Sequence, residues 1–287
     1  MHTIHTLVIL LLPVAGVVLL FLLTARLPRG NEPDDPPPPR PVCPVDPGQR
    51  AWIERSLLWC AREFGEAAAL RPIVLPTADL LPTPYDASEF QIHQIYRRIS
   101  PLMGVDPDKI ELRLRERLDQ GPPSDQAERG DRRIVGRYRS PRYLRLRWFD
   151  AKIYLGRHSI EIERAQTADP ARLIALLAHE LAHRRLLGEG RVTAAQPDQE
   201  RLTDLLTIYL GLGLFTANLR EGIEGHLGYL TAAERGYALA CYCRMRAEFG
   251  VPGWANRLHP EPRALLAQSL AFLAFEAAGP ADPDPPR

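Results

Sequence analysis

The segment AHELAHRRLLGEG, residues 178–190, places two histidines four positions apart, with a glutamate directly after the first. In an α-helix, residues four apart lie on the same face, so His179 and His183 can offer two imidazole nitrogens to one cation. Glu180 is rotated by one residue and can reach a water beside that cation. Zinc lowers the pKa of such a water to about 7, and Glu180 can then accept its proton as a general base. The H-E-x-x-H pattern therefore predicts a zinc site, although the same spacing also arises by chance.

The helix that carries this pattern is predicted to be buried. Its sequence, ARLIALLAHELAHRRLL, is apolar on nearly all sides. Asp169 is expected to cap the helix, Pro170 suits its first position, and Gly188 ends it. Two histidines and a glutamate inside a core need partners, because unpaired buried polar groups are costly. A metal would supply one partner, and a hydrogen bond to the second ring nitrogen would supply another.

A third ligand is expected from the next segment, PDQERLTD, residues 197–204. Glu200 and Asp204 lie four apart and share a helix face. Glu200 has the longer side chain and is predicted as the ligand, whereas Asp204 is predicted to accept the free N–H of His179 or His183. The alternative is the solvated face of an amphipathic surface helix. The apolar stripe roughly opposite the two acids consists of Leu202, Leu205, Leu206 and Tyr209.

Three further side chains are candidates for a hydrogen-bond donor that stabilises the transition state. They are His226 and Tyr229, in EGIEGHLGYL, and Tyr237. The alternative for each is a structural role, because buried Tyr and His side chains commonly satisfy local hydrogen bonds.

H-E-x-x-H on one helix followed by E-x-x-x-D on the next resembles the gluzincin metallopeptidases. This family includes thermolysin-type enzymes, the small minigluzincins and the membrane-bound HtpX-like group. The resemblance covers about residues 158–210 and implies a zincin-like catalytic domain. The strand SIEIERA, ahead of the helix, matches the family's edge strand, which pairs with an extended substrate. The chain departs from the family in Arg184, where an uncharged residue is usual, and in its single predicted membrane span.

The resemblance also implies roles for individual residues. It implies one Zn²⁺ per chain, with His179, His183 and Glu200 as its ligands. It implies that Glu180 is the catalytic base and that Asp204 orients a zinc histidine.

Other metal-binding families fit the sequence less well. Metzincins need a third histidine six residues after the second, and that position is Glu189. Deformylases use an upstream cysteine ligand, and Cys60 is far away in the sequence. Di-iron bundles need two E-x-x-H pairs, and the sequence holds one, from Glu180 to His183.

Residues 4–25 contain no charged side chain other than His5, and about 20 apolar residues span a bilayer. An uncleaved transmembrane anchor is predicted. The alternative, a cleaved signal peptide, is disfavoured because no Lys or Arg precedes the run and Leu23-Thr24-Ala25 is a poor cleavage site. We expect a single-pass protein of the inner (plasma) membrane. The arginines that follow the run favour a cytoplasmic catalytic domain, with a periplasmic or extracellular domain as the alternative.

The rest of the chain is predicted to form one α+β domain, residues 49–278, after a proline-rich linker, residues 26–48. Residues 279–287 are expected to be a disordered tail. The expected sheet is small and mostly antiparallel, and the C-terminal half is expected to be helical. Strands are predicted at RPIVLP, KIELRLRERL, RIVGRYR, YLRLRWF, AKIYLG and SIEIERA.

Composition excludes some classes of partner. The formal net charge is +1 with no basic stripe, so nucleic acid is not expected to bind. The four cysteines are predicted to be ordinary thiols, because Cys241 and Cys243 lie two apart in a helix and point to different sides.

The expected function is that of a membrane-anchored zinc metalloendopeptidase acting on protein or peptide substrates. The alternative is a non-catalytic, membrane-tethered interaction protein on a zincin-like scaffold. The sequence reveals no substrate specificity.

Overall fold

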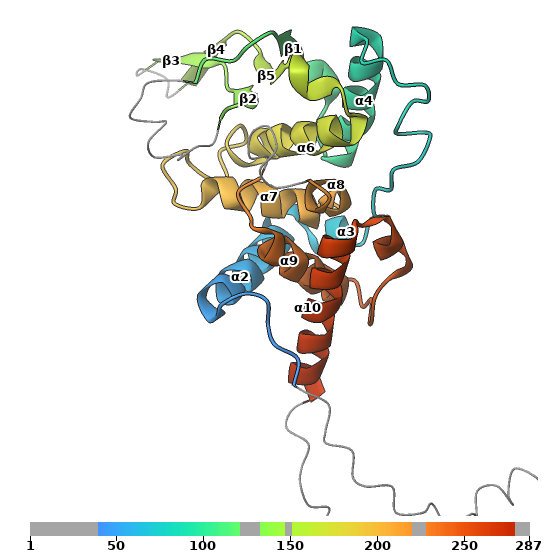
Figure 1. The fold of residues 1–287 in the computed structure, drawn as a ribbon. Helices are drawn as coiled ribbons and strands as arrows, with labels where there is room; N and C mark the ends of the chain where they lie inside the picture. The colour runs from blue at the N-terminus through green and yellow to red at the C-terminus, as the bar shows by residue number, and fades with distance from the viewer. Residues whose placement is uncertain (1–39, 121–132, 147–150, 220–227, 279–287) are drawn as a thin grey trace, which may run out of the picture. The chain divides into compact units, whose positions relative to one another are not determined.

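Helix α6 (Pro170–Leu186) lies between a small β-sheet and further helices (Figure 1). Its N-terminus forms as expected, because Asp169 accepts a hydrogen bond from the Ala171 N–H and Pro170 occupies the first turn. Most of its residues are buried on all sides. The helix that carries H-E-x-x-H is therefore a central element of the core.

The computed structural model describes residues 40–120, 133–146, 151–219 and 228–278. Apart from Arg40, they belong to one unit that begins at Pro41. Within these ranges, no helix is long and apolar enough to cross a bilayer. The predicted anchor, residues 26–39 of the predicted linker and the predicted tail lie outside the described residues.

The sheet has the strand order β1-β5-β2. Strand β5 (His158–Glu163) pairs in parallel with β1 (Ile110–Arg115) and antiparallel with β2 (Gly136–Arg139). Strands β3 (Arg142–Leu146) and β4 (Ala151–Leu155) form a separate antiparallel pair. The three-stranded sheet is thus mixed, and the expectation of a mostly antiparallel sheet does not hold for β1 and β5, which are parallel.

Strand β5 is the central strand and not the edge strand that the sequence suggested. Its apolar face, with Ile160 and Ile162, is completely buried. On its other face, Glu161 and Glu163 are also buried, because arginines of the neighbouring segments form ion pairs with both carboxylates. Alternation of apolar and charged residues predicts a strand, but it does not distinguish an outer strand from one whose charges are neutralised by its neighbours.

The expected α+β class with a helical C-terminal half is correct. The other helices are α2 (Pro47–Phe64), α3 (Glu66–Ala69), α4 (Glu89–Leu102), α7 (Gln199–Tyr209), α8 (Gly213–Ala217), α9 (Ala232–Met245) and α10 (Pro260–Ala278). Short 3₁₀ turns cover Pro107–Lys109, Arg164–Thr167 and Gly253–Arg257. Helix α9 starts with a capping box of Thr231 and Glu234.

One local expectation differs from the structure, and another agrees with it. Residues 71–76 form no strand, although the Val74 N–H donates to the Gly211 carbonyl at 3.0 Å, because a single backbone bond does not make a ladder. The four cysteines are free, as expected, and burial raises the pKa of both Cys241 and Cys243 to about 12.

Candidate metal centre

Three ligand atoms from α6 and α7 converge on one point. The Nε2 atoms of His179 and His183 lie 3.1 Å apart. Glu200 Oε2 lies 3.3 Å from the first and 3.2 Å from the second. Within the described part of the chain, these three residues form the one cluster of this kind that could hold a metal ion. The helix spacing of four residues aligns the two imidazoles, and α7 brings the carboxylate to them.

The triangle fits a zinc ion. Zinc bonds of about 2.0–2.2 Å in tetrahedral geometry separate neighbouring ligand atoms by about 3.3–3.5 Å. Glu200 Oε2 is buried and makes no properly oriented hydrogen bond with a protein group, although it faces both nitrogens. A cation would satisfy this oxygen and both nitrogens together. Two histidines and a glutamate form a known donor set of catalytic zinc sites, in which the fourth position remains open.

The electrostatics of the cluster also favour a cation. Burial lowers the pKa of His179, but Asp204 and Glu200 outweigh this effect and raise it well above its usual value. Burial raises the pKa of Glu200, but the two imidazoles outweigh it and hold that pKa well below its usual value. The cluster therefore favours positive charge at its centre, which a metal ion can provide.

Asp204 contacts the ring nitrogen of His179 that faces away from the cluster. Its Oδ1 lies 2.8 Å from His179 Nδ1, so that Nε2 is left to face the centre of the cluster. Its Oδ2 accepts hydrogen bonds from the backbone N–H groups of Tyr229 and Leu230. The side chain is 5% exposed. The alternative of a solvated helix face is therefore wrong at this position.

Replacement of Asp204 by Asn is expected to lower zinc affinity by about 10- to 100-fold, because the partner of a metal histidine loses its charge. A competition titration of the purified protein with a chromophoric chelator measures this affinity. Asp108→Asn is the matched control, since Asp108 is a surface residue paired with Arg97. Equal zinc affinity in Asp204→Asn and the wild type would contradict an orienting role.

Gln199 and Thr203 contact the second histidine, and neither was expected at the site from the sequence. The Gln199 amide nitrogen lies 3.0 Å from His183 Nδ1, and Thr203 Oγ1 lies 3.4 Å from the same atom. A metal on His183 Nε2 requires a proton on Nδ1, so Gln199 would then present its amide oxygen after a flip of the carboxamide. The available sequence signal was the i, i+4 spacing of two polar residues beside Glu200 on α7.

The loop between α6 and α7, residues 187–198, is attached to the rest of the fold by side-chain contacts. Arg191 donates to the carboxylate and backbone carbonyl of Glu63, both at 2.9 Å, and its guanidinium lies over the Phe64 ring. Asp198 adopts a left-handed conformation, with φ of 60°, directly before α7 begins. These contacts fix the start of α7 and hence the position of Glu200.

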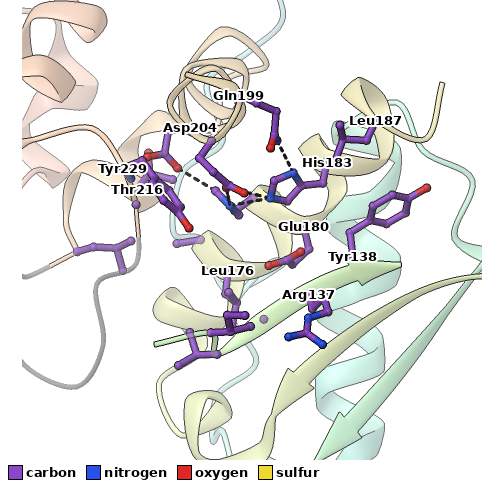
Figure 2. Close-up of a pocket in the computed structure, with 18 of the residues that line it drawn as sticks. Arg137, Tyr138, Leu176, Glu180, His183, Leu187, Gln199, Asp204, Thr216 and Tyr229 are labelled. Carbon is purple, nitrogen blue, oxygen red and sulfur yellow. Dashed lines mark hydrogen bonds and ion pairs between the residues drawn. The ribbon is translucent and has the colours of Figure 1, made fainter. Parts of the chain in front are cut away.

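Glu180 lies beside the cluster, against strand β2 (Figure 2). It is 3% exposed. Burial raises its pKa, whereas His183, His179 and a hydrogen bond from the Tyr138 backbone lower it, and the net shift is upward. The carboxylate is thus placed beside the ligand atoms without being one of them, and its raised pKa suits an exchange of protons.

Gly136 on β2 provides the space for Glu180. A Cβ atom at this position would lie 2.7 Å from Glu180 Oε1 and 2.6 Å from Leu176 Cδ1. Both distances are shorter than van der Waals contact. Strand β2 can therefore approach α6 this closely because position 136 has no side chain.

Gly136→Ala is expected to displace the Glu180 carboxylate and to destabilise the fold by about 1–3 kcal/mol, the usual cost of overpacking. Denaturant unfolding measures the stability, and a peptide-hydrolysis assay at matched zinc content is expected to show reduced activity. Gly253→Ala is the control, because a Cβ there meets nothing within 4 Å. Unchanged stability and activity in Gly136→Ala would show that the two side chains move aside freely.

The candidate transition-state donors divide into three cases. Tyr229 lies at the site, with its ring stacked against that of His179 at a centroid distance of 6.0 Å. Tyr237 does not, because its hydroxyl donates to Glu54 Oε1 on α2 at 2.6 Å and it is not among the residues lining the cavity. His226 lies outside the described residues.

A cavity of about 540 Å³ opens onto the cluster. Strand β2 forms one wall, and α6, α7 and the residues around Tyr229 form the others (Figure 2). Its lining includes Gly136, Leu176, Thr216 and Leu219 together with the metal-centre residues. This volume accommodates several residues of an extended peptide or one small molecule.

Comparison of the chain with family models, with curated proteins and with solved structures finds no match. The site is therefore interpreted from its own geometry.

Proposed function

We propose that this chain is a zinc-dependent metallopeptidase of the gluzincin type. The observation that carries the proposal is the convergence of His179 Nε2, His183 Nε2 and Glu200 Oε2 beside the buried carboxylate of Glu180. The zincin-like fold, the peptidase activity and the use of one zinc per chain belong to this proposal.

The proposed chemistry is hydrolysis of a peptide bond. Bound zinc would supply a Lewis acid that polarises the scissile carbonyl and lowers the pKa of the attacking water. Glu180 would accept the proton of the water and deliver it to the departing amine. Asp204 and Gln199 would hold the two histidine rings in their orientations. Tyr229, which lies beside His179, is the remaining candidate donor for the developing oxyanion among the described residues.

The substrate is proposed to bind as an extended strand at the edge of β2 and not at β5. Strand β2 is one of the two outer strands of the sheet, and it is the one that lies directly against Glu180. Backbone hydrogen bonds to an exposed sheet edge are a common way to bind an extended peptide. Such pairing would place the scissile bond beside the Glu180 carboxylate.

The membrane anchor remains part of the proposal. The apolar run of residues 4–25 supports a single-pass protein of the inner (plasma) membrane. The arginines after the run support a cytoplasmic catalytic domain.

The test uses the full chain purified in detergent. We expect one zinc per chain by elemental analysis, and cleavage of an unfolded protein that stops with a zinc chelator and resumes when zinc is restored. Zinc binding without cleavage of any substrate would favour the non-catalytic scaffold. Failure to bind zinc after reconstitution would overturn the proposal.

A further inference from the structure

The free edge of β2 presents the backbone groups of two residues. The Glu163 N–H donates to the Val135 carbonyl, and the β2–β5 register continues from there without a bulge. In an antiparallel ladder, alternate residues of a strand bond to the same neighbour. Residues 135, 137 and 139 therefore bond to β5, and the N–H and C=O groups of Gly136 and Tyr138 point to the other edge. Of these groups, the Tyr138 N–H donates to the Glu180 carboxylate.

This edge is closed on one side of Gly136 and open at Gly136 itself. The Gln120 carboxamide pairs with the Ile134 backbone, accepting from its N–H at 2.7 Å and donating to its carbonyl at 2.9 Å. No strand of the described residues pairs with the edge beyond this point. The open pairing groups thus begin next to Glu180.

Arg137 lies between Gly136 and Tyr138 on β2, and its side chain is on the opposite side of the strand from Glu180 (Figure 2). It donates to the Asp119 backbone carbonyl, which holds it near the edge. No carboxylate of the described residues lies within ion-pair distance of its guanidinium. Its cross-strand partner Glu161 forms ion pairs with Arg115 and Arg139 instead. Arg137 therefore brings a positive charge that no carboxylate among the described residues neutralises by direct contact.

A strand added antiparallel to this edge would place one of its residues directly opposite Arg137. Because the Gly136 N–H and C=O groups and the Tyr138 C=O would form the new hydrogen bonds, the residue opposite Arg137 would occupy a non-hydrogen-bonded pair. In such pairs the Cα atoms lie about 4.5 Å apart and the side chains are close together on one face. The neighbouring residues of the added strand would point to the other face, toward α6 and the metal centre.

We infer that Arg137 is a specificity-determining residue that selects an acidic side chain in the peptide substrate. The acidic residue would stand directly beside a residue whose side chain enters the cavity. This inference rests on the proposed peptidase function and adds a substrate class to it.

The test is cleavage of a random peptide library by the full-length, zinc-loaded protein, with the cleaved bonds identified by mass spectrometry. We expect Asp and Glu to be enriched about 2- to 5-fold at one fixed position relative to the cleaved bond, the effect of a facing charge pair. Arg137→Ala is expected to remove this enrichment, and Arg137→Glu to replace it with enrichment of Lys and Arg. Arg97→Ala, an exposed arginine on α4, is the control.

The outcomes separate the inference from the function on which it rests. Cleavage by the wild type without an acidic preference would overturn the inference and leave the peptidase proposal standing. An acidic preference that persists in Arg137→Ala would also overturn it. Absence of cleavage by the zinc-loaded wild type would overturn the peptidase proposal, and the inference with it.

Discussion

Replacing Glu180 with Gln is expected to reduce peptide hydrolysis by roughly 10²- to 10⁴-fold while the protein keeps one zinc per chain. Glu180 is not one of the three converging ligand atoms, so its loss leaves the donor set intact. Glutamine has the same shape and can still accept the hydrogen bond from the Tyr138 backbone. The glutamine side chain cannot accept a proton from water, and this is the role that the proposed chemistry gives to Glu180.

The same substitution is expected to leave the zinc-free fold at least as stable at neutral pH. Burial raises the pKa of Glu180, so the folded state disfavours the carboxylate more than the unfolded state does. Stability from this group is complete below its unfolded pKa and falls as pH rises through its folded pKa. Glutamine carries no charge and removes this loss.

Elemental analysis, denaturant unfolding and a hydrolysis assay on one preparation measure the three quantities. Glu261→Gln makes the same chemical change at an exposed position of α10 and should match the wild type in all of them. Activity that persists in Glu180→Gln at the wild-type level would remove Glu180 as the base. Loss of zinc in this variant would indicate that Glu180 contributes to metal binding.

Replacing Glu200 with Ala is expected to lower the zinc content from one per chain to near zero at micromolar metal. The carboxylate supplies one of three converging atoms and the only negative charge among them. Without it, two imidazoles remain, and a zinc site held by two protein ligands is weaker than either structural or catalytic zinc sites, which use three or four.

Thermal unfolding offers a second measurement of the same substitution. A ligand that binds the folded state alone stabilises it by about 4 kcal/mol at a free concentration 1,000 times its Kd. We therefore expect added zinc to raise the Tm of the wild type and to leave that of Glu200→Ala unchanged. Glu111→Ala, on the exposed face of β1, is the control and should respond like the wild type. A zinc-dependent rise in Tm in Glu200→Ala would show that the metal binds elsewhere.

The sequence determined those features that depend on neighbours along the chain. Helical periodicity alone aligns His179 with His183 and Glu200 with Asp204, because residues four apart share a helix face. The cap at Asp169 and the capping box at Thr231 also follow from residues within one turn. For this reason, the two pairs of aligned side chains and the starts of α6 and α9 could be predicted before any tertiary contact was known.

The tertiary structure decided which elements meet. The alternating pattern of SIEIERA predicted a strand, but the arginines that neutralise Glu161 and Glu163 come from distant segments, and they allow β5 to be the central strand. The same non-local packing placed Tyr237 against Glu54 on α2, away from the metal centre. It also placed Gly136 against Glu180, and Gln199 against His183. Such contacts join residues far apart in the chain, and local periodicity carries no information about them.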